Sequence, residues 1–161
     1  MPSGNFWQLR LGSRRLDVRQ MAANVRQMPT SALAIPYDDD LRVDEIVRKG
    51  VPAKALREIA SILKVDLSKL ALAVRISRRT LERRLADGAT LPLDEGDRTL
   101  RIGRLLAKAT DVFEDRGEAA LWFVEPLDIL GGVSPLDLCS TDAGARAVEQ
   151  ALGRIEHGVF G

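Results

Sequence analysis

The feature that most constrains the fold of this chain is a twelve-residue stretch, SRRTLERRLADG, at residues 77–88. Leu81 and Leu85 are four residues apart, so they share one face of a helix. Ser77 can cap the start of that helix, and Gly88 can end it in the left-handed conformation. The ten residues before it, LSKLALAVRI, predict a short buried helix. Two short helices with a tight connection, the second rich in Arg, are typical of a helix-turn-helix.

The polar face of the second helix predicts a DNA-binding surface. Four Arg fall within seven residues, and they repel one another unless an anion lies opposite. In a helix-turn-helix the second helix enters the DNA major groove and meets bases and phosphates there. The predicted DNA-binding residues are Ser77, Arg78, Arg79, Thr80, Arg83 and Arg84. We expect Arg79, Arg83 and Arg84 on the exposed arc. The alternative is an ordinary amphipathic helix pair with a solvated basic face.

Charge is unevenly distributed along the 161 residues, although the formal net charge is only +1. Residues 41–90 hold twelve Lys or Arg against six Asp or Glu, whereas residues 91–161 hold seven against thirteen. A basic middle and an acidic C-terminal half indicate that the two halves meet different partners.

Apolar spacing predicts an all-α fold. The predicted helices outside the helix-turn-helix span residues 41–50, 52–65, 93–115, 117–124 and 141–157. Aromatic residues make up only 4% of the chain, which also favours helices over strands. The longest of these helices is apolar over a broad arc, so we expect it to join the two halves of the molecule.

The chain divides into three predicted parts. Residues 1–40 form an N-terminal arm, partly flexible, with a possible helix at 18–28 and a linker at 29–40. Residues 41–90 form the helix-turn-helix domain, and residues 91–161 form a second helical domain. A helix-turn-helix usually acts in two copies. We therefore expect at least a dimer, with Leu105, Leu106 or Ala109 near the contact.

The sequence contains a second informative stretch, LGGVSPLDL, at residues 130–138. Gly131 and Gly132 permit a sharp chain reversal, and Ser134-Pro135 is a cap followed by a first-turn proline. The single cysteine, Cys139, follows directly. It excludes an internal disulfide framework and fits a small buried side chain in a protein of the reducing cytoplasm.

Several function classes find no support in the sequence. No uncharged run approaches the roughly 18 residues of a membrane span. There is no Gly-rich phosphate loop, His-Cys cluster or nucleophile motif, so we expect no enzyme and no cofactor. His157 is the only histidine. Without companion ligands it is expected to lie at the end of the last helix and not to bind a metal.

Taken in order, the motifs resemble one family. After the Arg-rich helix come DRTLRIGRLLAKA, a lone Trp, LGGVSPLDL and TDAGARAVEQALGRIEHGVFG. Over residues 41–161 this order resembles the antitoxins of the Xre/MbcA/ParS type, and the ending ALGRIEHGVFG is its most specific part. The resemblance implies an Xre-like helix-turn-helix followed by a helical toxin-binding domain. It also implies a RES-domain toxin that degrades NAD, an active site blocked by the antitoxin's C-terminal region, and repression of the operon at operator DNA.

The resemblance directs attention to the C-terminal half for toxin binding. The predicted toxin-binding residues are Trp122, Gly131, Gly132, Arg154, Glu156, His157, Val159 and Phe160. The segment WFVEPLDILGG departs from the family by lacking the Asn of its Pro-Asn pair. We expect a homodimer or a higher hetero-oligomer with the toxin. The alternatives are a free-standing Xre-family regulator whose C-terminal domain only dimerises, and a helical adaptor without a DNA role.

Overall fold

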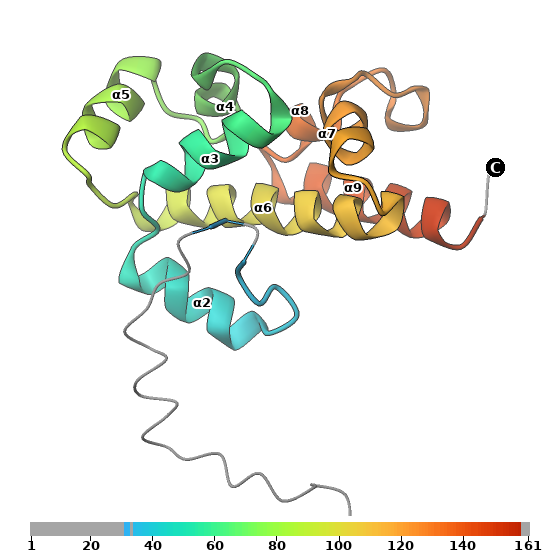
Figure 1. The fold of residues 1–161 in the computed structure, drawn as a ribbon, viewed down its shortest axis with the longest axis horizontal. Helices are drawn as coiled ribbons and strands as arrows, with labels where there is room; N and C mark the ends of the chain where they lie inside the picture. The colour runs from blue at the N-terminus through green and yellow to red at the C-terminus, as the bar shows by residue number, and fades with distance from the viewer. Residues whose placement is uncertain (1–30, 33, 159–161) are drawn as a thin grey trace, which may run out of the picture.

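The computed structural model describes residues 31, 32 and 34–158 (Figure 1). Three predictions lie outside these residues: the flexible arm before residue 31, the helix at 18–28, and the roles of Val159 and Phe160. The described part is helical, and it holds no strand, only two isolated β-bridges. The prediction of an all-α fold is confirmed. No described helix is long and apolar enough to cross a membrane.

The helices follow the predicted order closely. They are α2 (Asp40–Lys49), α3 (Lys54–Leu63), α4 (Leu67–Ala73), α5 (Arg78–Ala86), α6 (Leu93–Phe113), α7 (Arg116–Val124), the 3-10 helix η1 (Asp128–Leu130), α8 (Pro135–Leu138) and α9 (Asp142–Glu156). Each helix predicted within the described residues is present, with ends that differ by up to three residues, close to the usual uncertainty of helix boundaries.

Local capping explains where these helices begin and end. The side chains of Asp66, Ser77 and Ser134 accept hydrogen bonds from backbone amides in the first turns of α4, α5 and α8. Such bonds satisfy amide groups that have no partner within the helix. Gly88 after α5 and Gly158 after α9 have φ of 60° and 65°, the left-handed conformation that ends a helix. The caps predicted at Ser77, Gly88 and Ser134 are confirmed.

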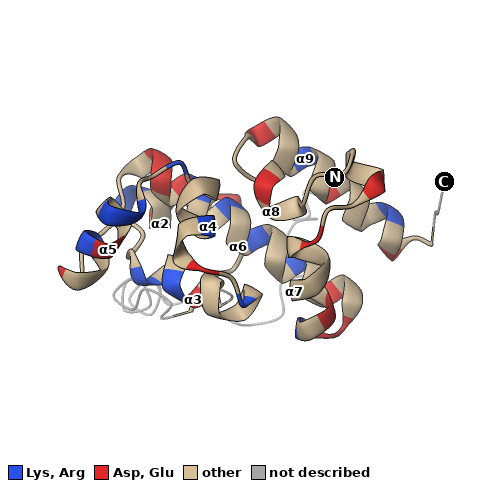
Figure 2. Cartoon of the chain, turned by 90° about the horizontal axis from the view of Figure 1, so that it is seen from above, with Lys and Arg blue, Asp and Glu red and all other residues tan. Residues whose placement is uncertain are grey.

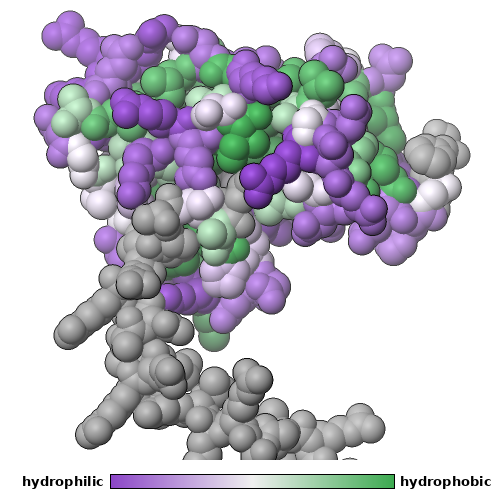
Figure 3. Space-filling model, viewed as in Figure 1, coloured by the Kyte–Doolittle hydropathy of each residue, from purple (hydrophilic) through white to green (hydrophobic). Residues whose placement is uncertain are grey.

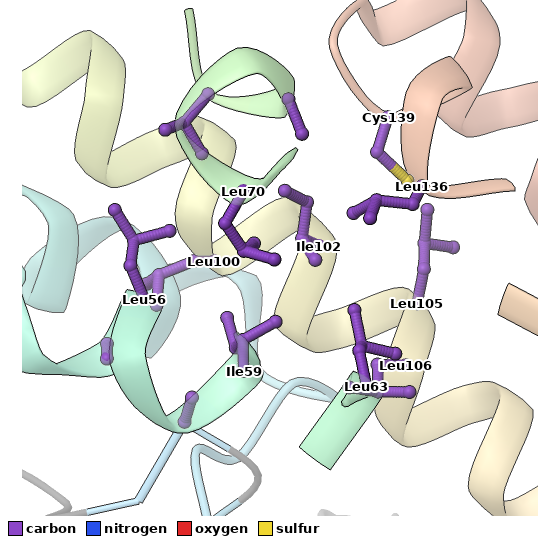
Figure 4. Close-up of a cluster of buried hydrophobic side chains, with 14 of the residues drawn as sticks. Leu56, Ile59, Leu63, Leu70, Leu100, Ile102, Leu105, Leu106, Leu136 and Cys139 are labelled. Carbon is purple, nitrogen blue, oxygen red and sulfur yellow. The ribbon is translucent and has the colours of Figure 1, made fainter. Parts of the chain in front are cut away.

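Helix α6 is the axis of the molecule. Figure 1 shows α3, α4 and α5 along one end of α6. Along the other end of α6 lie α7, α8 and α9, and α2 lies on the opposite side of α6. The close-up in Figure 4 shows side chains of α3, α4 and α8 converging on α6. The apolar α6 side chains at 0% exposure are Ile102, Leu105, Leu106 and Ala109. The prediction that this helix joins the two halves is confirmed, and both halves share one core.

The predicted dimer contact on α6 is wrong. Leu105, Leu106 and Ala109 are each 0% exposed within a single chain. The apolar arc of α6 is broad because helices pack on it from several sides, namely α2, α3, α7 and α9. A second copy therefore finds none of these side chains at the surface.

The described residues of the predicted linker pack on the body. Ala32 and Ile35 are buried, and the backbone N–H of Ala32 donates to Glu58 on α3 at 2.9 Å. The Tyr37 hydroxyl donates to the Ala32 carbonyl at 2.5 Å, and its burial raises the pKa of the phenol. We call residues 31, 32 and 34–39 the strap. Sequence alone missed it because its contact with the body, from Ala32 to Glu58, joins residues that are 26 positions apart.

Candidate DNA-binding and protein-binding surfaces

The turn between α4 and α5 sets the direction of the Arg-rich helix. The Ile76 N–H donates to the Ala71 carbonyl at 2.9 Å, and the Arg75 N–H donates to Leu72 at 3.0 Å. Arg75 has a φ of 62°, a conformation that favours Gly and is uncommon for a side chain of this size. Its side chain is exposed. Sequence reasoning missed Arg75, although a basic residue in a helix-turn-helix turn was available as a signal.

Helix α5 presents two free cations to solvent. Leu81 is fully buried, and Arg79 and Arg83 are exposed, as predicted. Neither forms an ion pair with another described residue. Ser77, which caps the helix, is also exposed, and Thr80 is half-buried. Figure 2 shows Lys and Arg on α5, and Asp and Glu around α7 and α8.

Arg78 is exposed but already has partners. Its Nη1 lies 3.1 Å from Asp66 Oδ1 and 2.8 Å from Ser68 Oγ, and its Nε lies 2.7 Å from Glu82 Oε1. The hydrogen bond to Glu82 and the charge of Asp66 raise the pKa of the guanidinium. These contacts link the start of α5 to the start of α4.

The prediction that Arg84 lies on the exposed arc is wrong. Its side chain is 18% exposed and forms an ion pair with Glu95, which is 13% exposed, in the first turn of α6. The physical reason is helical periodicity. Position 84 follows the buried Leu81 by three residues, so it lies on the same side of α5, toward α6.

The C-terminal candidates fall into two groups, and the first is at the end of the molecule that holds α7. Trp122 is half-buried, with its ring centroid 5.8 Å from Phe113 and 6.4 Å from Phe123. Gly131 and Gly132 are exposed with φ of 71° and 78°. The turn they form is closed by the Gly132 N–H, which donates to the Leu127 carbonyl at 2.9 Å. The predicted chain reversal is confirmed.

The second group is at the end of α9. Arg154, Glu156 and His157 are exposed, and the His157 backbone N–H donates to the Gly153 carbonyl at 3.1 Å. The apolar side chains of α9 hold it to the body: Ala145, Val148 and Leu152 are buried and Ile155 is half-buried. The structure does not bring this group and Trp122 into one cluster.

Sequence reasoning missed three exposed apolar side chains near the first group. Leu121, Ile129 and Val133 are 54%, 49% and 38% exposed. All three lie in the short segment from α7 to the residue after the Gly131-Gly132 turn. Figure 3 shows hydrophobic residues reaching the surface at the end of the molecule that carries α7 and α9. No periodic pattern marks them because the segment contains only short elements.

Cys139 is an inert part of the core. It is 0% exposed, and burial raises the pKa of its thiol to about 12. The thiol therefore stays protonated near neutral pH and cannot act as a nucleophile. The described residues also hold no group of three or more His, Cys, Asp or Glu side chains arranged for a metal ion.

Comparison with known proteins identifies the family. Residues 42–104 match the model of the antitoxin Xre-like helix-turn-helix domain, and residues 108–158 match that of the antitoxin Xre/MbcA/ParS C-terminal toxin-binding domain. Antitoxin Xre of Yersinia enterocolitica is 37% identical over 129 residues, which cover 80% of this chain and 87% of the relative. The chain belongs to the Xre antitoxin family.

Two further antitoxins are similar. The Prs ADP-ribosylating antitoxin of Sphingobium sp. is 30% identical over 124 residues, covering 71% of this chain and 78% of the relative. Antitoxin Xre of Photorhabdus laumondii is 28% identical over 128 residues, covering 79% of this chain and 86% of the relative. In this Xre antitoxin the helix-turn-helix match contains α4 and α5, and the toxin-binding match contains α7, α8 and α9. The two matches meet inside α6, which agrees with the single core.

Proposed function

We propose that this Xre-family antitoxin acts in the cytoplasm in two ways: it blocks the active site of an NAD-degrading RES-domain toxin, and it represses its own operon at operator DNA. The observation that carries the proposal is the succession of the two family matches along one chain. A free-standing regulator whose C-terminal domain only dimerises has no need of a toxin-binding domain.

The DNA role is supported by α5. Two exposed Arg of α5 have no ion-pair partner among the described residues: Arg79 lies in the first turn after the Ser77 cap, and Arg83 lies in the last turn. Phosphates approach helix N-termini readily, and Arg binds phosphates and guanine well. The unpaired cations therefore have anions to meet at the DNA surface. Arg75, in the turn before α5, adds a third cation that is suited to contact with the phosphate backbone of DNA.

The test of the DNA role is binding to the promoter of the antitoxin's own operon at several salt concentrations. Arg79→Ala and Arg83→Ala are each expected to cost about 1–3 kcal/mol if the side chain meets a base. If it meets a phosphate, the slope of log K against log salt falls in magnitude by about 0.9. Arg116→Ala is the matched control, since Arg116 is an exposed cation on α7. Unchanged binding by the Arg79→Ala/Arg83→Ala variant removes α5 from the DNA surface.

The toxin role is supported by chemistry as well as by the family match. The name of the Sphingobium relative includes ADP-ribosylation, a reaction in which NAD donates the ADP-ribose group. NAD carries a pyrophosphate, so a cleft that binds it is expected to be positively charged. Residues 91–161 hold seven Lys or Arg against thirteen Asp or Glu. An acidic domain of this kind is complementary to such a cleft and speeds association with it.

The end of the chain beyond α9 is the proposed blocking element. Arg154, Glu156 and His157 face solvent at the end of α9, and Phe160 follows the helix-ending Gly158. An aromatic side chain that enters a partner's pocket often supplies much of the binding energy. Deleting residues 158–161 is therefore expected to weaken neutralisation while leaving the helical fold and DNA binding intact.

The measurements are growth rescue by co-expression with the toxin and NAD consumption by the purified toxin. Circular dichroism establishes that the truncated antitoxin is folded. Full protection by the truncated chain moves the blocking surface to Trp122, Gly131 and Gly132. Promoter binding by the same truncated protein serves as the internal control.

We also propose that the antitoxin acts as a homodimer or in a higher hetero-oligomer with the toxin, because successive major grooves require two reading helices. The contact lies outside the buried arc of α6. Light scattering at high micromolar concentration tests this proposal. It is contradicted if the antitoxin is a monomer when alone and if its complex with the toxin contains a single antitoxin chain.

A further inference from the structure

We propose that the Arg84–Glu95 ion pair is a positioning device for DNA binding: Arg84 holds the reading helix on α6 and does not touch DNA itself. The inference rests on the proposed DNA role of α5. It assigns to Arg84 and Glu95 an effect on DNA affinity that acts through the orientation of Arg79 and Arg83.

Helix α5 depends on a few contacts for its position. It has nine residues, fewer than an isolated helix needs to be stable in water. Leu81 is the one residue of α5 that is fully buried. The pair between Arg78 and Asp66 is 53% and 62% exposed, and exposed pairs of this kind contribute little. Arg84 and Glu95, at 18% and 13% exposure, are much better shielded from water.

Glu95, the partner of Arg84, lies in a part of the fold that backbone hydrogen bonds hold in place. Glu95 lies in the first turn of α6, just after the connection from α5. The Leu91 N–H donates to the Val51 carbonyl at 2.7 Å, and the Ala53 N–H donates to the Ala89 carbonyl at 3.0 Å. These two bonds tie the connection to the segment before α3. Among the described residues, the Arg84–Glu95 pair is the ion pair that joins α5 to α6.

Geometry separates Arg84 from the cations that face solvent. Successive side chains of an α-helix are about 100° apart around the axis, so Arg84 lies about 100° from Arg83 and about 140° from Arg79. The guanidinium turned toward Glu95 cannot reach a groove that Arg79 and Arg83 face. Without the pair, one half-buried charge is left without its partner, and the C-terminal half of α5 loses its hold on α6.

Substitution of Glu95 tests the positioning role, because this role and simple electrostatics predict opposite changes in DNA affinity. Glu95→Gln removes a negative charge from the DNA-binding half, so electrostatics alone predict tighter binding to DNA. The positioning role predicts the opposite: about tenfold weaker binding to the operon's promoter. The slope of log K against log salt changes less than it does in Arg83→Ala, because every side chain proposed to meet a phosphate is still present.

Three companion variants complete the experiment. Arg83→Ala is expected to lower the magnitude of the salt slope by about 0.9 for a lost phosphate contact. Arg84→Ala is expected to weaken binding with a clearly smaller change in slope. The swap Arg84→Glu/Glu95→Arg is expected to recover most of the affinity. Hydrogen exchange of the α5 amides provides a second measurement that needs no DNA, and faster exchange in Glu95→Gln is expected.

The outcomes are distinct. Equal or tighter DNA binding by Glu95→Gln, together with unchanged amide exchange, overturns the positioning role. The role is also overturned if Arg84→Ala reduces the slope of log K against log salt as much as Arg83→Ala does. Failure of the wild-type protein to bind promoter DNA, with or without toxin, refutes the proposed DNA function instead. In that case the exchange measurement still reports whether the pair holds α5 in place.

Discussion

Gly103 on α6 has no room for a side chain, and this makes a sharp test of how the strap is held. A Cβ at this position lies 2.2 Å from Tyr37 Oη, 3.2 Å from Tyr37 Cζ and 3.4 Å from the Ala32 carbonyl oxygen. The first distance is far below van der Waals contact. On helix propensity alone, Gly103→Ala is expected to stabilise α6 by about 1 kcal/mol. The structure predicts the opposite sign.

The size of the destabilisation follows from the contacts that Tyr37 loses in Gly103→Ala. Its hydroxyl must move away from Gly103, which breaks the hydrogen bond to Ala32, worth about 0.5–1.5 kcal/mol. Overpacking costs about 1–3 kcal/mol more, and the helix-propensity gain offsets about 1 kcal/mol. We expect Gly103→Ala to lower the free energy of unfolding by about 1–3 kcal/mol. For a chain of this size that lowers Tm by about 3–10 °C.

Urea unfolding in two backgrounds isolates the clash. Tyr37→Phe removes Oη, the nearest atom, and leaves Cζ at 3.2 Å. Gly103→Ala added to Tyr37→Phe is therefore expected to cost little or to stabilise slightly. Gly153→Ala on α9 is the matched control, because a Cβ there meets nothing within 4 Å, and it should stabilise by up to about 1 kcal/mol. Equal destabilisation by Gly103→Ala in both backgrounds refutes the argument.

Three further predictions concern the core and one helix cap. Phe123→Ala, at a fully buried site, is expected to cost about 3–5 kcal/mol in urea unfolding. Because burial raises the pKa of Cys139 to about 12, a thiol reagent at pH 8 should label the native protein far more slowly than the urea-unfolded chain; equal rates contradict its burial. Hydrogen bonds from Ser68 lower the pKa of Asp66 below its ordinary 3.8, so the stabilisation is present above that value and is lost as pH falls through the lowered one. Asp66→Asn should therefore flatten the stability profile between pH 6 and pH 2, measured by thermal unfolding.

The sequence by itself determined the helices, their caps and the family. Ser77, Asp66 and Gly158 act on backbone groups within a few residues, so their effect is contained in the local sequence. The apolar spacing of α6 and α9 likewise reports which face each helix buries. For the same reason the exposed positions of Arg79 and Arg83, and of the residues at the end of α9, could be predicted from helical periodicity.

Only the tertiary structure decided which of the candidate residues are available to a partner. Arg84 points into the protein because Glu95 from α6 lies opposite, and the strap is held by Glu58 and by the space over Gly103. The apolar arc of α6 does not form a dimer contact, because helices far apart in the sequence cover it. Such contacts join residues that are distant along the chain. Local patterns state that a side chain is apolar or charged, but the identity of the group that meets it depends on the packing of the whole fold.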